Sequence, residues 1–235
     1  MITPERQVLD NVTAIRQRIA EAAARSGRPE TDVTLVAVTK YVTAAQMRPL
    51  LAAGCHDLGE SRPQQLWDKA GALADESVRW HFIGHLQRNK VRRTLPMVHL
   101  LRSGDSLRLL TAVDRELQQL GRPLPVLLEV NISGDVEKHG FLPQEVRRAL
   151  PDLLSLELLR IRGLMAMSAR ESDRESARRD FSHLRELRDQ LQKDAGNAAD
   201  LSQLSMGMSR DFVTAIEEGA TIVRVGSALF QGVSF

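Results

Sequence analysis

The feature that most constrains this chain is a repeated alternation of short apolar runs with helix-like segments. The run over 33–38 reads VTLVAV, which is too short for a packed helix and rich in β-branched residues. It predicts a buried strand. Runs of the same kind follow near residues 57–59, 80–83, 98–102, 126–130, 159–165, 203–205 and 221–225.

Helical patterns separate these predicted strands. They lie near residues 44–53, 64–74, 87–95, 106–120, 143–153, 174–192 and 210–217. A strand–helix alternation of this kind predicts a parallel sheet, and eight strands predict a closed (β/α)8 TIM-like barrel. An open doubly wound sheet would give the same alternation and remains the alternative. No linker-like composition divides the chain, so we expect one domain over residues 1–235.

An extra helix is predicted before the first strand. Thr3 can cap it, Pro4 suits its first turn, and Gly27 ends it. Between these ends, apolar residues recur at helical spacing, namely Val8, Val12, Ile15, Ile19 and Ala22.

Composition excludes several classes of protein. Acidic and basic residues are interspersed and sum to a net charge of +2, so no nucleic-acid partner is expected. The densest basic run, RNKVRR over 88–93, is read as a solvated helix face. No signal sequence or membrane-length apolar stretch occurs, and the lone Cys55 permits no internal disulfide. We therefore expect a cytoplasmic protein with no membrane association.

The residues just after the predicted strands are the candidates for chemistry, because barrel active sites lie at the carboxyl ends of the strands. Lys40 closes the run LVAVTK and should project over the barrel mouth. Partial desolvation there would lower its pKa and free the amine to attack an aldehyde. The alternative is a lysine that extends to water at a strand end.

A phosphate site is predicted after the last two strands. The segment LSMGMSRD over 204–211 leads into a helix, with Ser209 expected at the N-cap. Gly226 ends the last strand and would let the backbone approach a ligand closely. An ordinary helix cap and a turn glycine remain the alternative reading.

Arg224 stands inside an otherwise apolar strand. A buried arginine needs a partner, which could be a carboxylate such as Glu60 or Asp211, or an acceptor on a ligand. No metal site is predicted, because His81 and His85 flank a strand end and do not form a helical ligand pair.

Several longer runs together resemble the pyridoxal phosphate homeostasis protein family. They occur in the family's order and cover most of the chain from Val33 onward: LVAVTK, LGESRPQQL, WHFIGHLQRNK, SGDSLRLL, EVNISGDVEKHG, IRGLMAM and LSMGMSRDFVTAIEEGATIVRVGSALF. The resemblance implies a single barrel similar to the N-terminal domain of alanine racemase. It also implies that the chain carries or buffers pyridoxal 5'-phosphate, in vitamin B6 and amino-acid homeostasis.

The resemblance also implies roles for individual residues. Lys40 matches the lysine that holds the cofactor as a Schiff base, and Arg224 matches the arginine facing the pyridine nitrogen. Ser61 stands where the family usually has asparagine, so its contact with the cofactor is open. The phosphate contacts match Ser209, Gly226 and Ser227, with Ser205 and Met206 adjacent.

The resemblance leaves a carrier and a racemase-like enzyme as competing functions. Racemisation needs a proton-transfer group on each face of the substrate carbon. The resembled racemase has a further β-domain that contributes an opposing acid/base tyrosine across its dimer, whereas the lone Tyr41 of this chain directly follows Lys40. We therefore expect a monomeric carrier without efficient turnover, whose recipients would be apo-enzymes that depend on the cofactor. A protein-interaction module has no support in the sequence.

Overall fold

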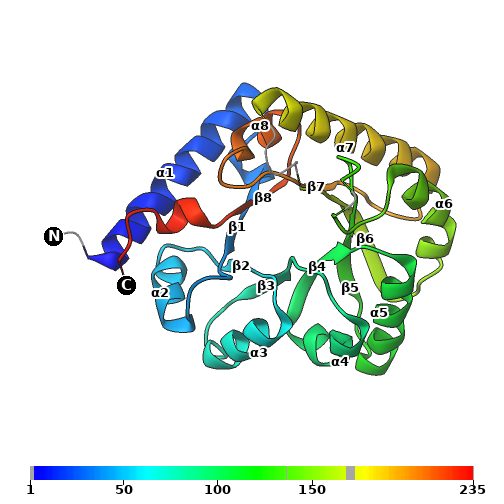
Figure 1. Ribbon diagram of the computed structural model, residues 1–235, viewed down its shortest axis with the longest axis horizontal. Coiled ribbons are helices and arrows are strands. Elements are labelled where there is room, and N and C mark those ends of the chain that lie inside the picture. The colour runs from blue at the N-terminus through cyan, green and yellow to red at the C-terminus, as the bar shows by residue number, and fades with distance from the viewer. Residues whose placement is uncertain (1–2, 136, 168–172, 235) are drawn as a thin grey trace.

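The fold is a closed parallel barrel, shown by a computed structural model that describes residues 3–135, 137–167 and 173–234. Over these residues each strand is hydrogen-bonded to the next, and the last returns to the first (Figure 1). The barrel confirms the predicted architecture and excludes the open sheet. The strands are β1 (Thr34–Val38), β2 (Asp57–Glu60), β3 (Arg79–Phe82), β4 (Val98–Gly104), β5 (Leu124–Glu129), β6 (Leu159–Met165), β7 (Gln203–Ser205) and β8 (Ile222–Val225).

Helices surround the barrel on its outside (Figure 1). Among the described residues, no helix combines the length and apolar character needed to cross a bilayer. The helices are α1 (Pro4–Arg25), α2 (Ala44–Ala52), α3 (Pro63–Ala72), α4 (Val91–Thr94), α5 (Leu107–Leu120), α6 (Pro143–Leu154), α7 (Arg174–Ala195) and α8 (Phe212–Glu217), with 3-10 turns η1 (Glu30–Asp32), η2 (Arg88–Lys90), η3 (Leu95–Met97) and η4 (Ser227–Phe230).

The prediction of a single helix over 87–95 is wrong. The segment is divided into η2, the short α4 and η3, where Pro96 lies in the first turn of η3. Proline has no N–H to donate, which disfavours a continuous α-helix here. The arginines of the basic run, Arg88, Arg92 and Arg93, are exposed as expected, and the Arg93 guanidinium lies 3.9 Å from the centre of the Trp67 ring.

The predicted N-terminal helix is present as α1. The Thr3 side chain accepts a hydrogen bond from the Arg6 amide at 3.3 Å, and the predicted apolar face is buried. This face packs against α8, η4 and α2, so α1 lies beside the C-terminal segment (Figure 1). Asn11 Nδ2 joins the two by donating to the carbonyls of Leu229 and Gln231 at 3.0 and 2.9 Å.

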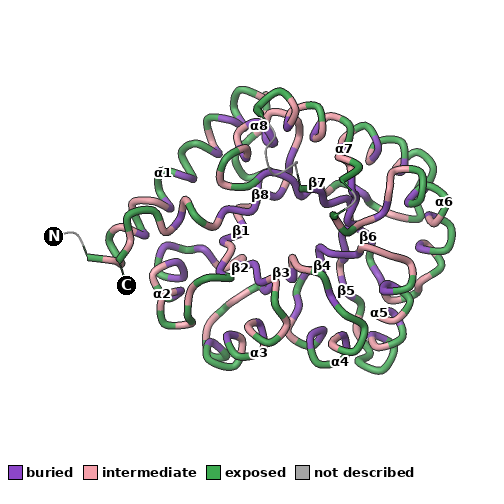
Figure 2. Tube along the Cα trace, in the orientation of Figure 1, coloured by how far each residue is buried: buried purple, intermediate pink, exposed green. Residues whose placement is uncertain are grey.

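The barrel interior has its own small apolar cluster, separate from the main core. The main core fills the space between the strands and the helices, and Figure 2 shows buried segments along the ring of strands. The interior cluster draws single residues from five strands, namely Val36, Leu100, Leu127, Met165 and Ile222. It closes the middle of the barrel, so a ligand site must lie above it, at the carboxyl ends of the strands.

Candidate functional site

A layer of buried polar residues lies above the apolar cluster. Side chains two residues apart on a strand share a face, so Arg102 follows Leu100, Glu129 follows Leu127, and Arg224 follows Ile222 toward the mouth. Ser205 of β7 belongs to the same layer and is fully buried. Arg224 was predicted from the sequence, but Arg102 and Glu129 were not, because they occupy the last inward positions of their strands and do not follow a strand end.

Arg224 is bound to protein oxygens on one side of the barrel. Its Nη1 donates to the Ser205 carbonyl at 2.9 Å and to Ser205 Oγ at 2.6 Å, and its Nη2 donates to the Ala166 carbonyl at 2.9 Å. Burial lowers the pKa of Arg224 to about 10, against the opposing charges of Glu129 and Asp211. The guanidinium therefore stays protonated near neutral pH. Its three bonds leave two of five N–H groups for another acceptor.

Arg224 does not form the ion pair with Glu60 that the sequence allowed. Glu60 instead pairs with Lys69, whose Nζ lies 2.5 Å from Glu60 Oε2. Lys69 Nζ also donates to the carbonyl of Thr39 at 2.8 Å. The pair is buried and joins α3 to the ends of β1 and β2, next to Lys40.

Arg102 is a second guanidinium in the polar layer. It is fully buried and donates from Nη2 to Ser205 Oγ, the hydroxyl that also accepts from Arg224. Burial and the charge of Arg224 lower its pKa. Its Nε and Nη1 are buried without a hydrogen-bond partner. Two cations therefore converge on one serine at the floor of the mouth.

Glu129 ends β5, on the far side of the barrel from β1 in the strand order. Burial, with the nearby charge of Asp105, raises its pKa to about 7, while Arg224 and His85 oppose the shift. Its side chain therefore exchanges a proton near neutral pH. A carboxyl group with such a pKa in a barrel mouth can act as an acid or a base.

Lys40 lies at the mouth as predicted, two residues beyond β1. Its side chain is exposed, so the desolvation expected from its position is not present. The Nζ lies 4.9 Å from the centre of the Tyr41 ring, which is 83% exposed. Tyr41 thus lies beside Lys40 rather than across the mouth from it.

Ser209 and Gly226 lie together, but Ser209 is not the cap of α8. Asp211 is the N-cap residue, and α8 begins at Phe212 rather than near residue 210. Ser209 Oγ instead accepts from the backbone N–H groups of Gly226 and Ala228, at 3.3 and 3.5 Å. The hydroxyl is drawn to η4 because the first N–H groups of a helical turn have no partner within the turn.

Gly226 is placed where the backbone needs a small residue. A Cβ on Gly226 would lie 3.3 Å from the Cβ of Val38, so the end of β8 passes close to the end of β1. Lys40 therefore approaches the Ser209 and Gly226 loops from the adjacent strand. These three residues and Arg224 all come from the neighbouring strand ends of β7, β8 and β1.

The other predicted site residues are more dispersed. Met206 is fully buried and its amide donates to the carbonyl of Ile222 at 3.2 Å, so it is part of the β7–β8 junction. Ser227 is exposed and begins η4, beside Gly226. Ser61 follows β2, where its amide donates to Glu60 Oε1 at 2.7 Å. Ser61 thus lies on the other side of Lys40 from the phosphate loops.

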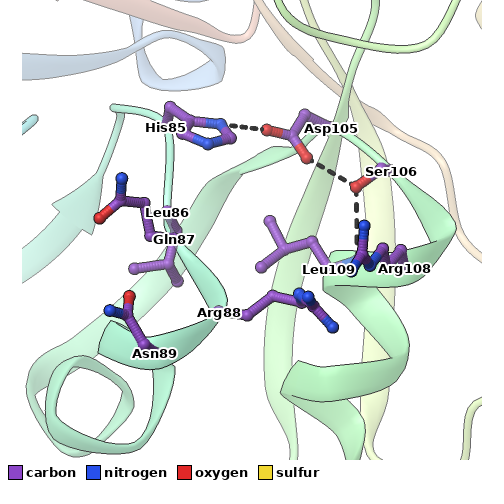
Figure 3. A pocket seen from close by; sticks show the side chains of 9 residues that line it. All are labelled: His85, Leu86, Gln87, Arg88, Asn89, Asp105, Ser106, Arg108 and Leu109. Carbon is purple, nitrogen blue, oxygen red and sulfur yellow. Dashed lines mark hydrogen bonds and ion pairs between the residues drawn. The ribbon is translucent and has the colours of Figure 1, made fainter.

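A pocket of about 490 Å³ lies on the opposite part of the mouth, after β3 and β4 (Figure 3). His85 and Asp105 point toward each other at its edge, with His85 Nδ1 2.7 Å from Asp105 Oδ2. Arg88 and Arg108 also line it.

Residues 11–233 match the sequence profile of the alanine racemase N-terminal domain. The chain is 38% identical over 221 residues to the pyridoxal phosphate homeostasis protein of Aquifex aeolicus, covering 94% of this chain and 96% of that protein. It is 39% identical over 223 residues to the protein of the same name in Pseudomonas aeruginosa, covering 95% and 94%.

Solved structures of related proteins have the same fold. PipY of Synechococcus elongatus PCC7942, with pyridoxal phosphate bound, is 37% identical and superposes with a TM-score of 0.82 over 90% of this chain and 99% of that chain. An unknown protein from Bifidobacterium adolescentis is 35% identical, with a TM-score of 0.89 over 96% and 95%. Alanine racemase of Clostridium difficile 630 shares the fold at 15% identity, with a TM-score of 0.72 over 94% of this chain and 55% of that chain.

Proposed function

Because the chain belongs to the pyridoxal phosphate homeostasis protein family, we propose that it binds pyridoxal 5'-phosphate at the barrel mouth and carries or buffers it. The observation that supports this most is the convergence at β7, β8 and β1. The amine of Lys40, the backbone N–H groups of Gly226 and Ala228 and the buried guanidinium of Arg224 come from these three neighbouring strand ends.

The phosphate would be held by Ser209 and the start of η4. The N–H groups of Gly226 and Ala228 already point at an oxygen, the Ser209 hydroxyl, and phosphate oxygens are acceptors of the same kind. Ser227 opens the same turn, and Ser205 and Met206 support it from β7. Gly226 leaves room for a ligand because it has no side chain.

The pyridine nitrogen would face Arg224, which has N–H groups to spare and a pKa of about 10. An arginine there donates to an unprotonated ring nitrogen, which weakens the cofactor as an electron sink. Ser61, at the end of β2, is the remaining predicted contact. When bound, the cofactor would supply an aldehyde and a conjugated ring for reactions of amines.

Lys40 would hold the cofactor covalently as a Schiff base. Its amine adds to the aldehyde carbonyl, a C=N bond forms, and the carbonyl oxygen leaves as water. The exposed amine is accessible for this step, and also for its reversal by water or by an incoming amine. Easy release suits a carrier that delivers the cofactor to apo-enzymes, within vitamin B6 and amino-acid homeostasis. We further propose that the chain acts as a single-domain monomer in the cytoplasm.

A racemase-like activity is the second candidate, and Glu129 is the observation that favours it. Glu129 ends β5, across the barrel from Lys40, and its pKa of about 7 suits proton transfer. Against this, Glu129 is only 6% exposed and lies in the barrel floor, where the charge of Arg224 acts on it. We therefore favour the carrier.

The covalent link is tested on the purified holoprotein. We expect borohydride to trap the cofactor on Lys40, found by peptide mapping, and Lys40→Ala to lose both the adduct and the Schiff-base absorbance. Lys90→Ala, which changes an outer-helix lysine, is the matched control. An adduct on a different lysine of the wild-type protein would contradict the proposal.

The phosphate site is tested by comparing two ligands. Ser209→Ala should weaken binding of pyridoxal 5'-phosphate by about 10-fold or more, as expected for a hydrogen bond to a charged group, and leave binding of pyridoxal unchanged. Ser202→Ala, an exposed serine before β7, should alter neither affinity. Equal losses for both ligands would place the phosphate elsewhere.

The choice between carrier and enzyme is tested by turnover. The holoprotein is incubated with single-enantiomer amino acids, and chirality is followed alongside cofactor transfer to an apo-enzyme. We expect transfer, with racemisation far below a kcat of about 1 s⁻¹. Racemisation above that rate, abolished by Glu129→Gln, would establish the enzyme instead.

A further inference from the structure

The part of the mouth away from the proposed cofactor site carries a second group of chemically active side chains. His85, Asp105 and His139 each offer one ligand atom, and these three atoms lie within 4.8 Å of one another. They come from the loops after β3, β4 and β5, whereas the proposed cofactor site uses β7, β8 and β1. We propose that these three residues form a binding site for a divalent transition-metal ion such as Zn²⁺ or Co²⁺.

The donor set suits such an ion. Two imidazoles and one carboxylate are typical ligands of Zn²⁺ and its neighbours, whereas Mg²⁺ and Ca²⁺ prefer oxygen alone. Ligand atoms about 2.0–2.2 Å from one ion lie roughly 3.4 Å apart in tetrahedral geometry. His85 Nδ1 and Asp105 Oδ2 are already closer than that, at 2.7 Å. The ion would replace the proton that they now share.

Asp105 is held in place before any ion binds. Its side chain is 7% exposed, and its second oxygen, Oδ1, accepts from Ser106 Oγ at 2.9 Å. Ser106 is in turn fixed as the cap of α5, because its Oγ accepts from the Leu109 amide (Figure 3). Such supporting contacts orient a ligand and are usual around metal sites.

His139 is held over His85 by the loop after β5. The next residue, Gly140, has a φ of +108°, and a Cβ there would lie 2.9 Å from the carbonyl oxygen of Glu129. This turn brings Phe141 back to β5, where its amide donates to that carbonyl at 2.8 Å. The rings of His85 and His139 consequently lie 4.2 Å apart, nearly parallel. His139 is exposed, so a small rotation can bring its nitrogen to an ion.

The site would keep open coordination positions. His85 and Asp105 border the pocket of about 490 Å³, which gives water or a small molecule access to the ion. Arg88 and Arg108 line the same pocket and would attract an anionic ligand to an open position. No metal site was predicted from the sequence, because the nearest histidine to His85 along the chain is His81. His139 lies ten residues beyond Glu129, where β5 ends, and no spacing rule connects it to them.

The test is a titration of untagged, metal-free protein with Co²⁺ and Zn²⁺. We expect one ion per chain, a Co²⁺ absorption spectrum typical of nitrogen and oxygen ligands, and an affinity loss in His85→Ala and in His139→Ala. Each loss should be at least the 10-fold that removal of a supporting contact costs a metal site. Both histidines are exposed, so neither change should disturb folding.

His183→Ala is the matched control, since His183 is an exposed histidine on α7. It should bind the ion as the wild type does. Failure of the wild-type protein to bind one equivalent, or binding that persists in either cluster variant, would overturn the proposal. Binding of pyridoxal 5'-phosphate is measured separately with the metal-free protein, so each proposal can fail without the other.

Discussion

At the scale of single residues, the barrel interior contains titratable groups whose charge states are set by burial. His81 on β3 is 3% exposed, and its Nε2 lies 2.9 Å from Asp57 Oδ1. Burial lowers its pKa to about 4, although the bond to Asp57 opposes the shift. Hydrogen bonds from His81 and Arg79 lower the pKa of Asp57 against the effect of burial. The native pair is therefore a neutral imidazole that donates to a carboxylate.

This pair predicts a loss of stability in mild acid. The unfolded chain gains a proton on His81 near its ordinary pKa of 6.5, whereas the folded chain gains it near 4. Folding stability should therefore decrease as the pH falls from 6.5 toward 4, and this histidine contributes about 2 kcal/mol of that loss between about pH 7.5 and pH 5. Urea unfolding of His81→Gln at both pH values should show a correspondingly smaller loss.

The contribution of Glu129 to folding stability changes with pH in the opposite direction to that of His81. Its folded pKa of about 7 exceeds the ordinary value of 4.5, so its contribution to folding stability decreases as the pH rises from 4.5 to about 7. The difference between wild type and His81→Gln, rather than the wild-type curve alone, is therefore the informative quantity. Equal losses in both proteins would show that the pKa of His81 is the same in the folded and unfolded chains.

At the scale of elements, α3 is tied to the ends of β1 and β2 by one buried ion pair. Lys69 on α3 bonds to Glu60 on β2 and to the carbonyl of Thr39, which precedes Lys40. Lys69→Met should cost about 3–5 kcal/mol of unfolding free energy, because it leaves the Glu60 carboxylate buried without its cation. The unfolding midpoint in urea measures this cost.

The double variant Lys69→Met with Glu60→Gln is the control, since it removes the unpaired charge and should recover part of the loss. The two single variants should also weaken cofactor binding, because Thr39 positions Lys40. A Lys69→Met protein as stable as the wild type would show that the pair is not a structural tie.

The elements themselves were largely predictable, and the reason is periodicity. Strands β6 and β7 were predicted with their exact bounds, because each lies between clear helical patterns. The error at 87–95 arose because apolar spacing alone does not distinguish one continuous α-helix from the sequence of η2, α4 and η3. Ser209 was wrongly predicted to be the N-cap of α8, because its hydrogen-bond partners are distant in the sequence. Its partners, Gly226 and Ala228, are 17 and 19 residues away, and local spacing carries no signal for such contacts.

The polar floor was predictable only in part. The two-residue alternation of β4 and β5 places Arg102 and Glu129 inward, so a closer examination of the strands could have found both. The raised pKa of Glu129 could not be predicted, because it depends on the burial and charge that the closed barrel creates. The same holds for His139, which a glycine turn brings to His85.

At the scale of the whole molecule, α1 is hydrogen-bonded to the C-terminal end of η4. Asn11 Nδ2 donates to the carbonyls of Leu229 and Gln231, on either side of the end of η4. Asn11→Ala should therefore cost about 1 kcal/mol, since it removes a partly buried hydrogen bond to Leu229 and an exposed one to Gln231. Because η4 supplies the proposed phosphate donors, affinity for pyridoxal 5'-phosphate should fall as well.

Thermal unfolding and ligand titration of Asn11→Ala check both effects. Gln17→Ala is the control, because Gln17 is exposed on the same helix and bonds to Glu21 of α1. Loss of stability with unchanged affinity would separate α1 from the site.

The ring of strands is unevenly closed. β8 pairs with β1 over Thr34 to Ala37, whereas its strand pairing with β7 is limited to Ser205 and Ile222 and is continued by the backbone hydrogen bonds of Thr221, Met206 and Arg224. The proposed cofactor would contact residues from both β7 and β8. Its covalent link to Lys40 would also connect these strands to β1. It would thus hold β7, β8 and β1 together, so the loaded protein should resist protease longer than the empty one, increasingly as the cofactor concentration exceeds its Kd. Cellular abundance of the protein would then itself register how much cofactor is free.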